Sequence, residues 1–292
     1  MAYHSLLVFD VVGVSNLDRY AVPPQLPEDA PQQVADLFAI YQDLKKRNLQ
    51  ESYHDAHQAV DDAVNMFNLG SITIEQRALI ERLFWSVCSK ILRMVRELDY
   101  TPEELQGLES LLSDTYFCNF SVFQSMPDSW AIKQLFPIMP IHRLNEAPNR
   151  KGVLGDITCD SDGKVDQFID LRDVRNTLQL HEFNGQPYYL GAFLLGAYQE
   201  ILGDLHNLFG DTNAVHVSVD ANGQLHIDEF IKGDTVREVL AYVQYKADEL
   251  TDRLRKDLEK AVRLGTITIA ESREMLDFYQ HGLEGYTYLE EH

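Results

Sequence analysis

Basic side chains are scarce in this sequence. Its 292 residues include 25 lysines and arginines against 46 aspartates and glutamates, so the formal net charge is -21. Such an acidic surface repels phosphate backbones and anionic lipids, which disfavours nucleic acid and membranes as partners. A cationic ligand would instead be attracted, although acidic surfaces also serve solubility alone.

Cysteines and long apolar runs are also lacking. The three cysteines, Cys88, Cys118 and Cys159, are an odd number and far apart, which favours a reduced, cytoplasmic protein. No run reaches the ~20 apolar residues that a membrane helix requires. The first residues carry no basic cluster, and the apolar run over 6–14 leads to no small-residue cleavage site. We therefore expect neither export nor a membrane span.

What is present suffices for a sizeable core, because 45% of the residues are hydrophobic. Residues 5–14 are apolar and β-branched almost without break, which predicts a strand buried on both faces. Since such a strand needs neighbours, we expect the earlier part of its sheet to lie outside this chain. A proline-rich connector follows the strand.

A helical period extends over about 30–113. Apolar residues recur there at three- and four-residue spacing, which predicts a bundle of about four helices. The second helix is expected over about 51–68. The start signals of the other three are Asp29, a capping box of Thr73 and Gln76, and Thr101-Pro102 with Glu104.

From about 115 the period shortens to that of strands. Residues 215–219 and 224–227 flank Ala221-Asn222-Gly223, which predicts a hairpin with a turn-forming Asn-Gly pair. Many short strands at close spacing imply an antiparallel barrel or sandwich. Asp234 is the expected N-cap of a last helical region that runs to about 283 and is broken near Gly265.

Two segments carry the candidate chemistry. Residues 156–163 (DITCDSDG) place a thiol and a carboxylate side by side in a small polar loop after a strand. Residues 196–211 (GAYQEILGDLHNLFGD) begin with a tyrosine between small residues and continue with polar groups and an aromatic ring. Small residues beside a tyrosine leave room for a ligand to approach the backbone.

Each feature also has a plainer interpretation. A cysteine on a strand is more often buried filler than a reactive group, by roughly four to one. The residues after Cys159 could form just a hairpin turn. Tyr198 could be a core tyrosine whose hydroxyl is satisfied.

Metal sites have weak support in the sequence, and none is predicted. Asp160, Asp162 and Gly163 fit part of a calcium loop, but Thr158 and Ile169 stand where two essential carboxylates are required. His54 and His57 lack a definite third ligand, so an exposed polar helix face is predicted there. His181-Glu182 is interpreted as loop polarity.

The same strings resemble a known family. Residues 154–163 (LGDITCDSDG), 196–211, 119–130 (NFSVFQSMPDSW), 134–140 (QLFPIMP) and 285–290 (GYTYLE) are similar to the biosynthetic arginine decarboxylases of the alanine-racemase fold. The likeness runs through essentially the whole chain. Several long strings in one order are far more specific than a single motif.

The resemblance implies an α+β fold. The family joins an N-terminal (β/α)8 barrel, which carries pyridoxal phosphate on a lysine, to a C-terminal antiparallel β-barrel domain with an inserted helical bundle and appended helices. Applied to this chain, it implies a strand with a proline-rich connector (1–29), the inserted bundle (30–113), the β-barrel domain (114–235) and a C-terminal helical region (236–292). The (β/α)8 barrel is expected to be absent from this chain.

The resemblance also implies a reaction. Such enzymes decarboxylate L-arginine to agmatine, the entry to putrescine and spermidine, with pyridoxal phosphate and commonly Mg2+ as cofactors. They form dimers or tetramers whose active sites are shared between subunits. The cofactor is the electron sink, and the protein supplies position and electrostatics.

Site roles follow from the resemblance residue by residue. Cys159 resembles the thiol that a neighbouring subunit places beside the substrate α-carbon, where it governs reprotonation after CO2 leaves. Asp160 resembles the carboxylate that meets the distal cation, which suits a guanidinium. Tyr198 resembles a tyrosine near the cofactor phosphate. His206, Asn207 and Phe209 resemble the segment packed behind the substrate pocket.

The family's Schiff-base lysine and phosphate-binding loop have no counterpart in this sequence, so the chain alone is predicted to decarboxylate nothing. Three hypotheses follow. The chain is the C-terminal share of a truncated or split decarboxylase completed by an N-terminal barrel segment, a regulatory module that binds a complete decarboxylase, or an acidic scaffold without a ligand. The abrupt start in a strand favours the first, and Cys159, Asp160 and Tyr198 together disfavour the third.

Overall fold

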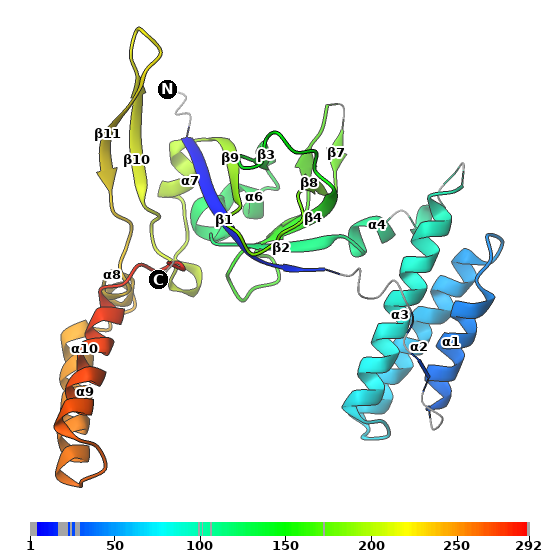
Figure 1. Cartoon of the computed structure of the whole chain (residues 1–292), viewed down its shortest axis with the longest axis horizontal. Coiled ribbons are helices and arrows are strands. Elements are labelled where there is room, and N and C mark those ends of the chain that lie inside the picture. Colours follow the sequence, from blue (N-terminus) through cyan, green and yellow to red (C-terminus); the bar gives the residue numbers. More distant parts are fainter. Residues whose placement is uncertain are drawn as a thin grey trace.

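The computed structural model describes residues 5–16, 23, 25–26, 30–98, 100, 102–105, 107–171 and 173–290. A curled, half-barrel sheet lies at the centre of a mixed α+β architecture (Figure 1). A helical bundle lies at one end of the molecule, and a hairpin with the C-terminal helices lies at the other (Figure 1). Among the described residues, no helix is both long and apolar enough to cross a membrane.

Strand β1 (Ser5–Ser15) is the centre of the sheet. Its first half pairs antiparallel with β9 (Tyr189–Leu195), and its second half pairs antiparallel with β2 (Asp114–Cys118). A register shift between Val11 and Gly13 separates the two halves, as expected where a strand bends. One strand therefore joins both halves of the curled sheet.

The remaining strands extend the sheet on both sides. The order is β3-β9-β1-β2-β4-β5, with β8 paired to β4. A separate two-stranded ribbon pairs β6 with β7. These short strands are β3 (Ile138–Pro140), β4 (Arg150–Gly155), β5 (Lys164–Val165), β6 (Phe168–Ile169), β7 (Val174–Arg175) and β8 (Leu178–Leu180).

The expected antiparallel arrangement is wrong at one pairing. Strands β2 and β4 run parallel, with Asp114 opposite Gly152 and Phe117 opposite Gly155. The connection between them passes through α5 (Val122–Ser125), α6 (Pro127–Ala131) and β3, so the chain crosses back before β4 begins. A crossover of this length brings a strand back in the same direction.

The prediction that the first strand is buried on both faces is also wrong. Phe9 and Val11 are buried, whereas Leu6 and Val8 on the alternate face are 47% and 49% exposed. Side chains alternate between the two faces of a strand. One face of β1 therefore enters the core, where Phe9 stacks on Phe120 with ring centroids 4.4 Å apart.

The helical bundle has its own core. It comprises α1 (Gln32–Asp43), α2 (Leu49–Asn68) and α3 (Ile74–Val95), and its buried residues form a cluster distinct from that of the sheet. Thr73 and Gln76 form the predicted capping box at the start of α3. Burial of the apolar helix faces against one another stabilises such a bundle more than helix propensity does.

The fourth predicted helix is wrong in length. The 3-10 helix η2 (Glu103–Leu105) and the single turn α4 (Leu108–Leu111) replace it and lead into β2. Leu105 and Leu108 are buried in the bundle core, so packing rather than regular helix fixes this connection. The expected caps Asp29 and Thr101 lie outside the described residues.

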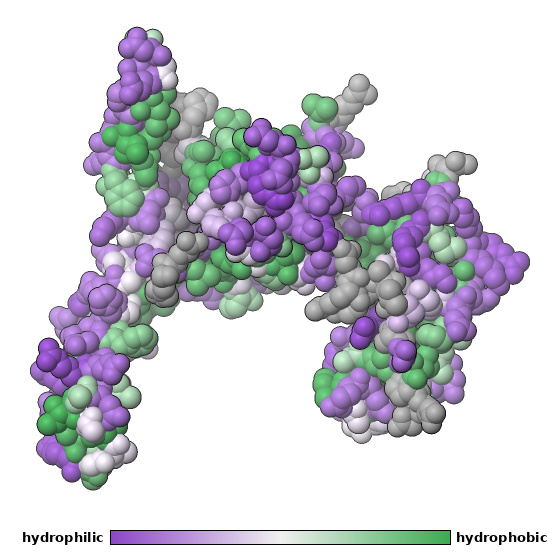
Figure 2. Space-filling model, viewed as in Figure 1, coloured by the Kyte–Doolittle hydropathy of each residue, from purple (hydrophilic) through white to green (hydrophobic). Residues whose placement is uncertain are grey.

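The predicted hairpin is confirmed. Strands β10 (Ala214–Val219) and β11 (Leu225–Ile231) pair antiparallel, and Gly223 has the positive φ of 80° that its turn requires. Apolar side chains are exposed on it, and Figure 2 shows hydrophobic surface there. Val217, Ile227 and Phe230 are 55%, 70% and 57% exposed.

The C-terminal helices are α8 (Val236–Tyr242), α9 (Ala247–Arg263) and α10 (Ile269–Leu283). The expected cap Asp234 is wrong by one residue, because Thr235 and Glu238 form the capping box of α8. The Asp234 side chain instead accepts a hydrogen bond from the Asp211 backbone at 2.9 Å. The predicted break is confirmed at Gly265, whose φ is 71°.

Candidate functional site

The two segments with candidate chemistry meet face to face. The loop between β4 and β5 carries Cys159 and Asp160, and the 3-10 helix η3 (His206–Leu208) carries His206 and Asn207. The Cys159 backbone amide donates to Asn207 Oδ1 at 3.4 Å, and Asn207 Nδ2 donates to Cys159 Sγ at 3.3 Å. His206 Nε2 lies 3.8 Å from Asp160 Oδ2. The structure thus brings four of the six predicted site residues into one cluster.

Asp156 builds the loop that presents Cys159. Its buried carboxylate accepts from the Val122 backbone at 2.8 Å through Oδ2. Its Oδ1 accepts from both the Thr158 backbone at 2.9 Å and the Thr158 hydroxyl at 2.6 Å. The sequence motif included Asp156, but no role was predicted for it, because its main partner comes from a distant element.

Gly163 closes the same loop. A Cβ atom at this position would collide with Asp156 Oδ1 and Thr158 Oγ1. Its backbone amide donates to the Asp160 carbonyl at 3.1 Å, and its carbonyl accepts from the Asp156 backbone at 2.8 Å. Only a residue without a side chain fits beside the buried carboxylate.

The thiol and carboxylate lie at the surface. Cys159 is the exposed member of the three cysteines, whereas Cys88 and Cys118 are buried. Burial raises the pKa of Cys88 to about 12 and that of Cys118 well above its ordinary value. The interpretation of Cys159 as buried filler is therefore wrong. An exposed thiol beside polar groups is open to a ligand, unlike the two buried ones.

The Asp160 carboxylate has capacity for a cation. Its Oδ1 accepts from the Asp162 backbone at 3.0 Å, and its side chain is 43% exposed. A carboxylate has about four acceptor positions, so one backbone contact leaves room for a guanidinium. In the part of the chain that the structure describes, no group of three or more His, Cys, Asp or Glu side chains could hold a metal ion.

His206 is supported by an aromatic ring. It packs on Phe123 with ring centroids 4.5 Å apart, and Phe123 packs in turn on Trp130 at 5.2 Å. The Phe123 carbonyl also accepts from the Asp204 backbone at 3.0 Å. The helix after β2 therefore forms a base for the segment that faces Cys159.

Phe209 contacts the C-terminal segment. Its ring lies 5.2 Å from that of Tyr288, and the buried Tyr288 hydroxyl donates to the Gly210 carbonyl at 2.9 Å. Asn119 makes two hydrogen bonds to the Leu289 backbone, at 2.8 and 3.0 Å. Tyr288 and Leu289 thus tie the C-terminal segment to Gly210, next to Phe209, and to Asn119 at the end of β2. No role was predicted for Tyr288 or Asn119.

Tyr198 stands on a different element from the four clustered residues. It stands in the first turn of α7 (Ala197–Ile201), and its side chain is 71% exposed. The next residue, Gln199, is buried and anchors α7 through two contacts with Asp128, at 2.6 and 3.2 Å. That anchor turns Tyr198 outward, so the interpretation of Tyr198 as a core tyrosine is wrong.

His54 and His57 lie on α2. His54 is exposed and pairs with Glu104 at 3.1 Å, as expected of a polar helix face. His57 is exposed as well, and its ring also packs edge-on against Phe84, with ring centroids 4.8 Å apart. Aromatic packing rather than metal ligation accounts for its place.

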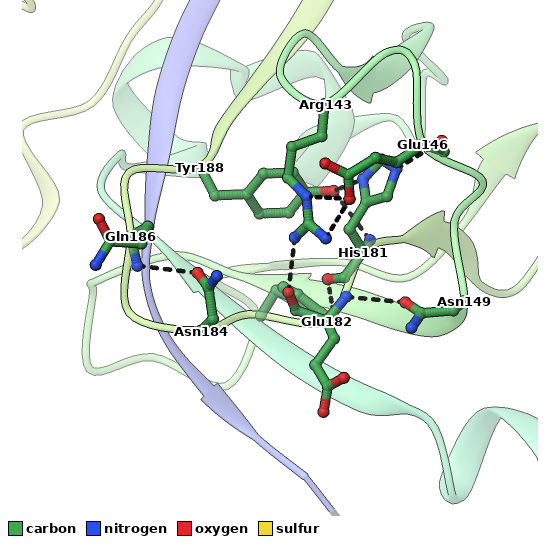
Figure 3. Close-up of polar contacts among 9 residues, drawn as sticks. Arg143, Glu146, Asn149, His181, Glu182, Asn184, Gln186 and Tyr188 are labelled. Atoms are coloured by element: carbon green, nitrogen blue, oxygen red, sulfur yellow. Dashed lines mark hydrogen bonds and ion pairs between the residues drawn. The ribbon is translucent and has the colours of Figure 1, made fainter.

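His181 is buried, so its interpretation as loop polarity is wrong. Its ring nitrogens lie 2.9 Å from the Tyr188 hydroxyl and 3.0 Å from the Glu146 carbonyl (Figure 3). Arg143 covers this network and donates to the Glu146 carboxylate at 2.6 Å and to the Glu182 carbonyl at 2.8 Å (Figure 3). These contacts join the loop after β3 to the loop after β8.

Comparison with known proteins agrees with this architecture. The family model described as "Arginine decarboxylase helical bundle domain" matches residues 27–109. A second, described as "Arginine decarboxylase C-terminal helical extension", matches residues 236–289.

Curated relatives match nearly the whole chain. The biosynthetic arginine decarboxylase of Gloeobacter violaceus is 52% identical over 99% of this chain and 45% of the relative. That of Bacteroides thetaiotaomicron is 49% identical over 99% of this chain and 46% of the relative. The crystal structure of the biosynthetic arginine decarboxylase from Campylobacter jejuni has a TM-score of 0.76 at 27% identity, over 98% of this chain and 46% of that one.

The chain is thus similar to biosynthetic arginine decarboxylases along nearly its whole length, and its matches include their helical bundle domain and C-terminal helical extension. The chain spans less than half the length of the curated relatives it matches.

Proposed function

We propose that this chain supplies the C-terminal share of an arginine decarboxylase active site, which a barrel segment of the longer relatives completes. The reaction converts L-arginine to agmatine and CO2, and leads toward putrescine and spermidine. The observation that carries the proposal is the exposed pair of Cys159 and Asp160, contacted from the second segment by Asn207 and His206.

Asp160 is the proposed partner of the substrate guanidinium. A carboxylate and a guanidinium form two parallel charge-assisted hydrogen bonds, which fix orientation as well as affinity. His206, packed on Phe123, is the proposed wall beside it, and Phe209, packed on Tyr288, is proposed to lie behind that wall. The formal charge of -21 adds a long-range attraction for a cationic substrate.

Cys159 is the proposed catalytic residue of this chain. When the bond between the substrate α-carbon and its carboxylate breaks, CO2 leaves and a proton must replace it on that carbon. A surface thiol held beside the α-carbon is able to control the delivery of that proton. The exposed position of Cys159 suits a group that reaches into a site shared with another segment or subunit.

We propose that this chain contacts only one part of pyridoxal phosphate, its phosphate group. When bound, the cofactor supplies the electron sink for decarboxylation. The exposed hydroxyl of Tyr198 is the proposed contact to its phosphate, because a phenol donates well to phosphate oxygens. Lysines of this chain form ion pairs with acidic side chains elsewhere in the structure. Lys46 pairs with Glu97, and Lys151 pairs with Glu109. We therefore predict that the cofactor lysine belongs to the completing segment.

The domain limits 1–29, 30–113, 114–235 and 236–292 divide the chain, and the completing segment closes the half-barrel sheet. The assembly is a dimer or tetramer with shared active sites. Three free cysteines suit a reducing cytoplasm. Mg2+ is assigned no site among the described residues.

Reconstitution tests the proposal. The chain is co-expressed with the portion of the Gloeobacter violaceus relative that it does not match, and the purified mixture is supplied with pyridoxal phosphate and carboxyl-labelled arginine. We expect labelled CO2 and agmatine from the mixture and none from either part alone. The C159A variant, added in place of the wild-type chain, is the matched control and should assemble with little turnover.

Two other outcomes would overturn the proposal. Turnover by the isolated chain with pyridoxal phosphate would show that no completing segment is required. Inhibition of a complete decarboxylase by the chain, without restored activity in the mixture, would instead support a regulatory module.

A further inference from the structure

The Asn207 side chain holds Cys159 at two points. Its Nδ2 donates to the thiol sulfur at 3.3 Å, and its Oδ1 accepts from the Cys159 backbone amide at 3.4 Å. One planar amide thus contacts both the reactive atom and the backbone of the same residue. A contact of this kind fixes the direction in which the thiol points.

The backbone around Asn207 is unusual. Asn207 has a φ of 58°, and Leu208 follows with 61°, both in the left-handed region. Asparagine tolerates that region better than most residues, whereas leucine does so at a cost. The Asp204 backbone bond to Phe123 and the packing of His206 on the same ring hold the segment there.

We propose that Asn207 is a positioning residue for Cys159. Its N–H group orients the sulfur and stabilises negative charge on it, because a donor to the charged form favours that form. Asn207 is therefore assigned a direct contact with the thiol, beyond the place in the segment behind the substrate pocket that the resemblance implies. The catalytic role of Asn207 rests on the proposed function, but its contact with Cys159 can be tested on this chain alone.

The surroundings of the sulfur make a neutral donor useful. Asp160 is the adjacent residue, and the buried Asp156 carboxylate bonds to Thr158 on the other side of Cys159, so these two acidic residues lie within three positions of the thiol. His206 faces Asp160 across the site at 3.8 Å. Asn207 offers an N–H group directly to the sulfur.

The experiment measures the reactivity of Cys159. The chain is treated with limiting iodoacetamide at fixed pH, and modification at Cys159 is followed by mass spectrometry. The two buried thiols do not compete, because burial keeps the pKa of Cys88 at about 12 and that of Cys118 far above its ordinary range. The thiolate ultraviolet absorbance, taken as a difference from the C159S variant, provides an independent readout.

Asn207→Asp is the decisive variant. It keeps the shape, the Oδ1 acceptor and the tolerance for left-handed backbone, but replaces the donor with a negative charge. We expect alkylation to slow roughly fivefold, which is the size of a repulsion between two charges about 4 Å apart when bulk water screens it. Asn222→Asp in the exposed β10–β11 turn adds the same charge far from the thiol and should leave the rate unchanged.

Asn207→Gly is the second variant. Glycine accepts the left-handed backbone and removes the donor without adding charge. We expect its thiolate absorbance at the same pH to fall below that of the wild-type chain, with helix content unchanged. A merely structural role for Asn207 would change neither the alkylation rate nor the absorbance once folding is matched.

Wild-type alkylation in N207D together with wild-type absorbance in N207G would overturn the proposal. That result would leave the decarboxylase assignment intact. Failure of reconstitution would remove the decarboxylase assignment. The contact between Asn207 and Cys159 would still be tested by the alkylation rate and the thiolate absorbance.

Discussion

The Asp156 carboxylate accepts a hydrogen bond from the Val122 backbone amide, which lies 34 residues earlier in the chain, at 2.8 Å. Val122 begins the helix α5 that also carries Phe123 under His206. Asp156 begins the loop that presents Cys159. A single buried carboxylate therefore ties together the two sides of the candidate site.

The first prediction concerns Asp156. Replacing it with alanine leaves the Val122 amide unpaired in a buried place and removes both contacts to Thr158. We expect the free energy of unfolding to fall by about 3 kcal/mol, as for loss of a buried charged acceptor. Urea denaturation of the chain measures it. D162A in the exposed part of the same loop is the control and should cost less than about 0.5 kcal/mol. Equal losses would contradict this account.

The second prediction concerns Gly163. An alanine methyl group would collide with Asp156 Oδ1 and Thr158 Oγ1, so the loop must shift to accommodate it. We expect G163A to lower the free energy of unfolding by roughly 1–3 kcal/mol, the usual cost of overpacking. G107A is a suitable control, because no described atom outside Gly107 and its two chain neighbours lies within 4 Å of a Cβ placed there. Wild-type stability in G163A would show that the loop opens freely.

Local signals in the sequence predicted several elements correctly. The capping box at Thr73 depends on residues three apart, and the hairpin depends on an adjacent Asn-Gly pair. The error of one residue at the start of α8, where Thr235 rather than Asp234 is the N-cap, also arises locally, because both residue types cap helices. Signals within one turn can be assessed from the residues alone.

Contacts between distant segments could not be predicted in this way. The parallel pairing of β2 with β4 depends on a crossover, and no periodicity encodes it. Burial of His181 requires Tyr188 and the Glu146 carbonyl, which only the fold brings together. The resemblance placed Cys159 and Asn207 in one site, but their direct contact spans 48 residues.

The third prediction concerns two buried tyrosines. Tyr116 donates to the His181 carbonyl and Tyr288 to the Gly210 carbonyl, each at 2.9 Å, and burial raises the pKa of both hydroxyls above the ordinary value of ~10. Above pH ~10 the unfolded chain loses these protons while the folded chain keeps them. Stability is therefore complete below pH ~10 and falls as the pH rises, by about 1.4 kcal/mol per unit for each tyrosine.

Phenylalanine substitutions separate these contributions. Y116F and Y288F should each lose about 1 kcal/mol at neutral pH and show a shallower alkaline decline. Urea denaturation between pH 8 and 11 provides both quantities. Y198F removes an exposed hydroxyl and should leave the alkaline slope at its wild-type value. An unchanged slope in the double variant Y116F/Y288F would assign the alkaline loss to other groups.

The last prediction concerns Asp160 in the reconstituted enzyme. The amide side chain in the D160N variant would keep an acceptor for the Asp162 backbone, so this variant should fold as the wild-type chain does. It would lose the charge and one of the two acceptors that a guanidinium requires. We expect KM for arginine to rise by roughly ten- to a hundredfold, because a hydrogen bond to a charged group contributes about 1.5–3 kcal/mol. Steady-state rates of agmatine formation measure KM and kcat separately.

D162N makes the same change in charge two residues away and should leave KM near that of the wild type. A similar rise in both variants would mean that general electrostatic attraction, rather than a contact with Asp160, draws the substrate to this site.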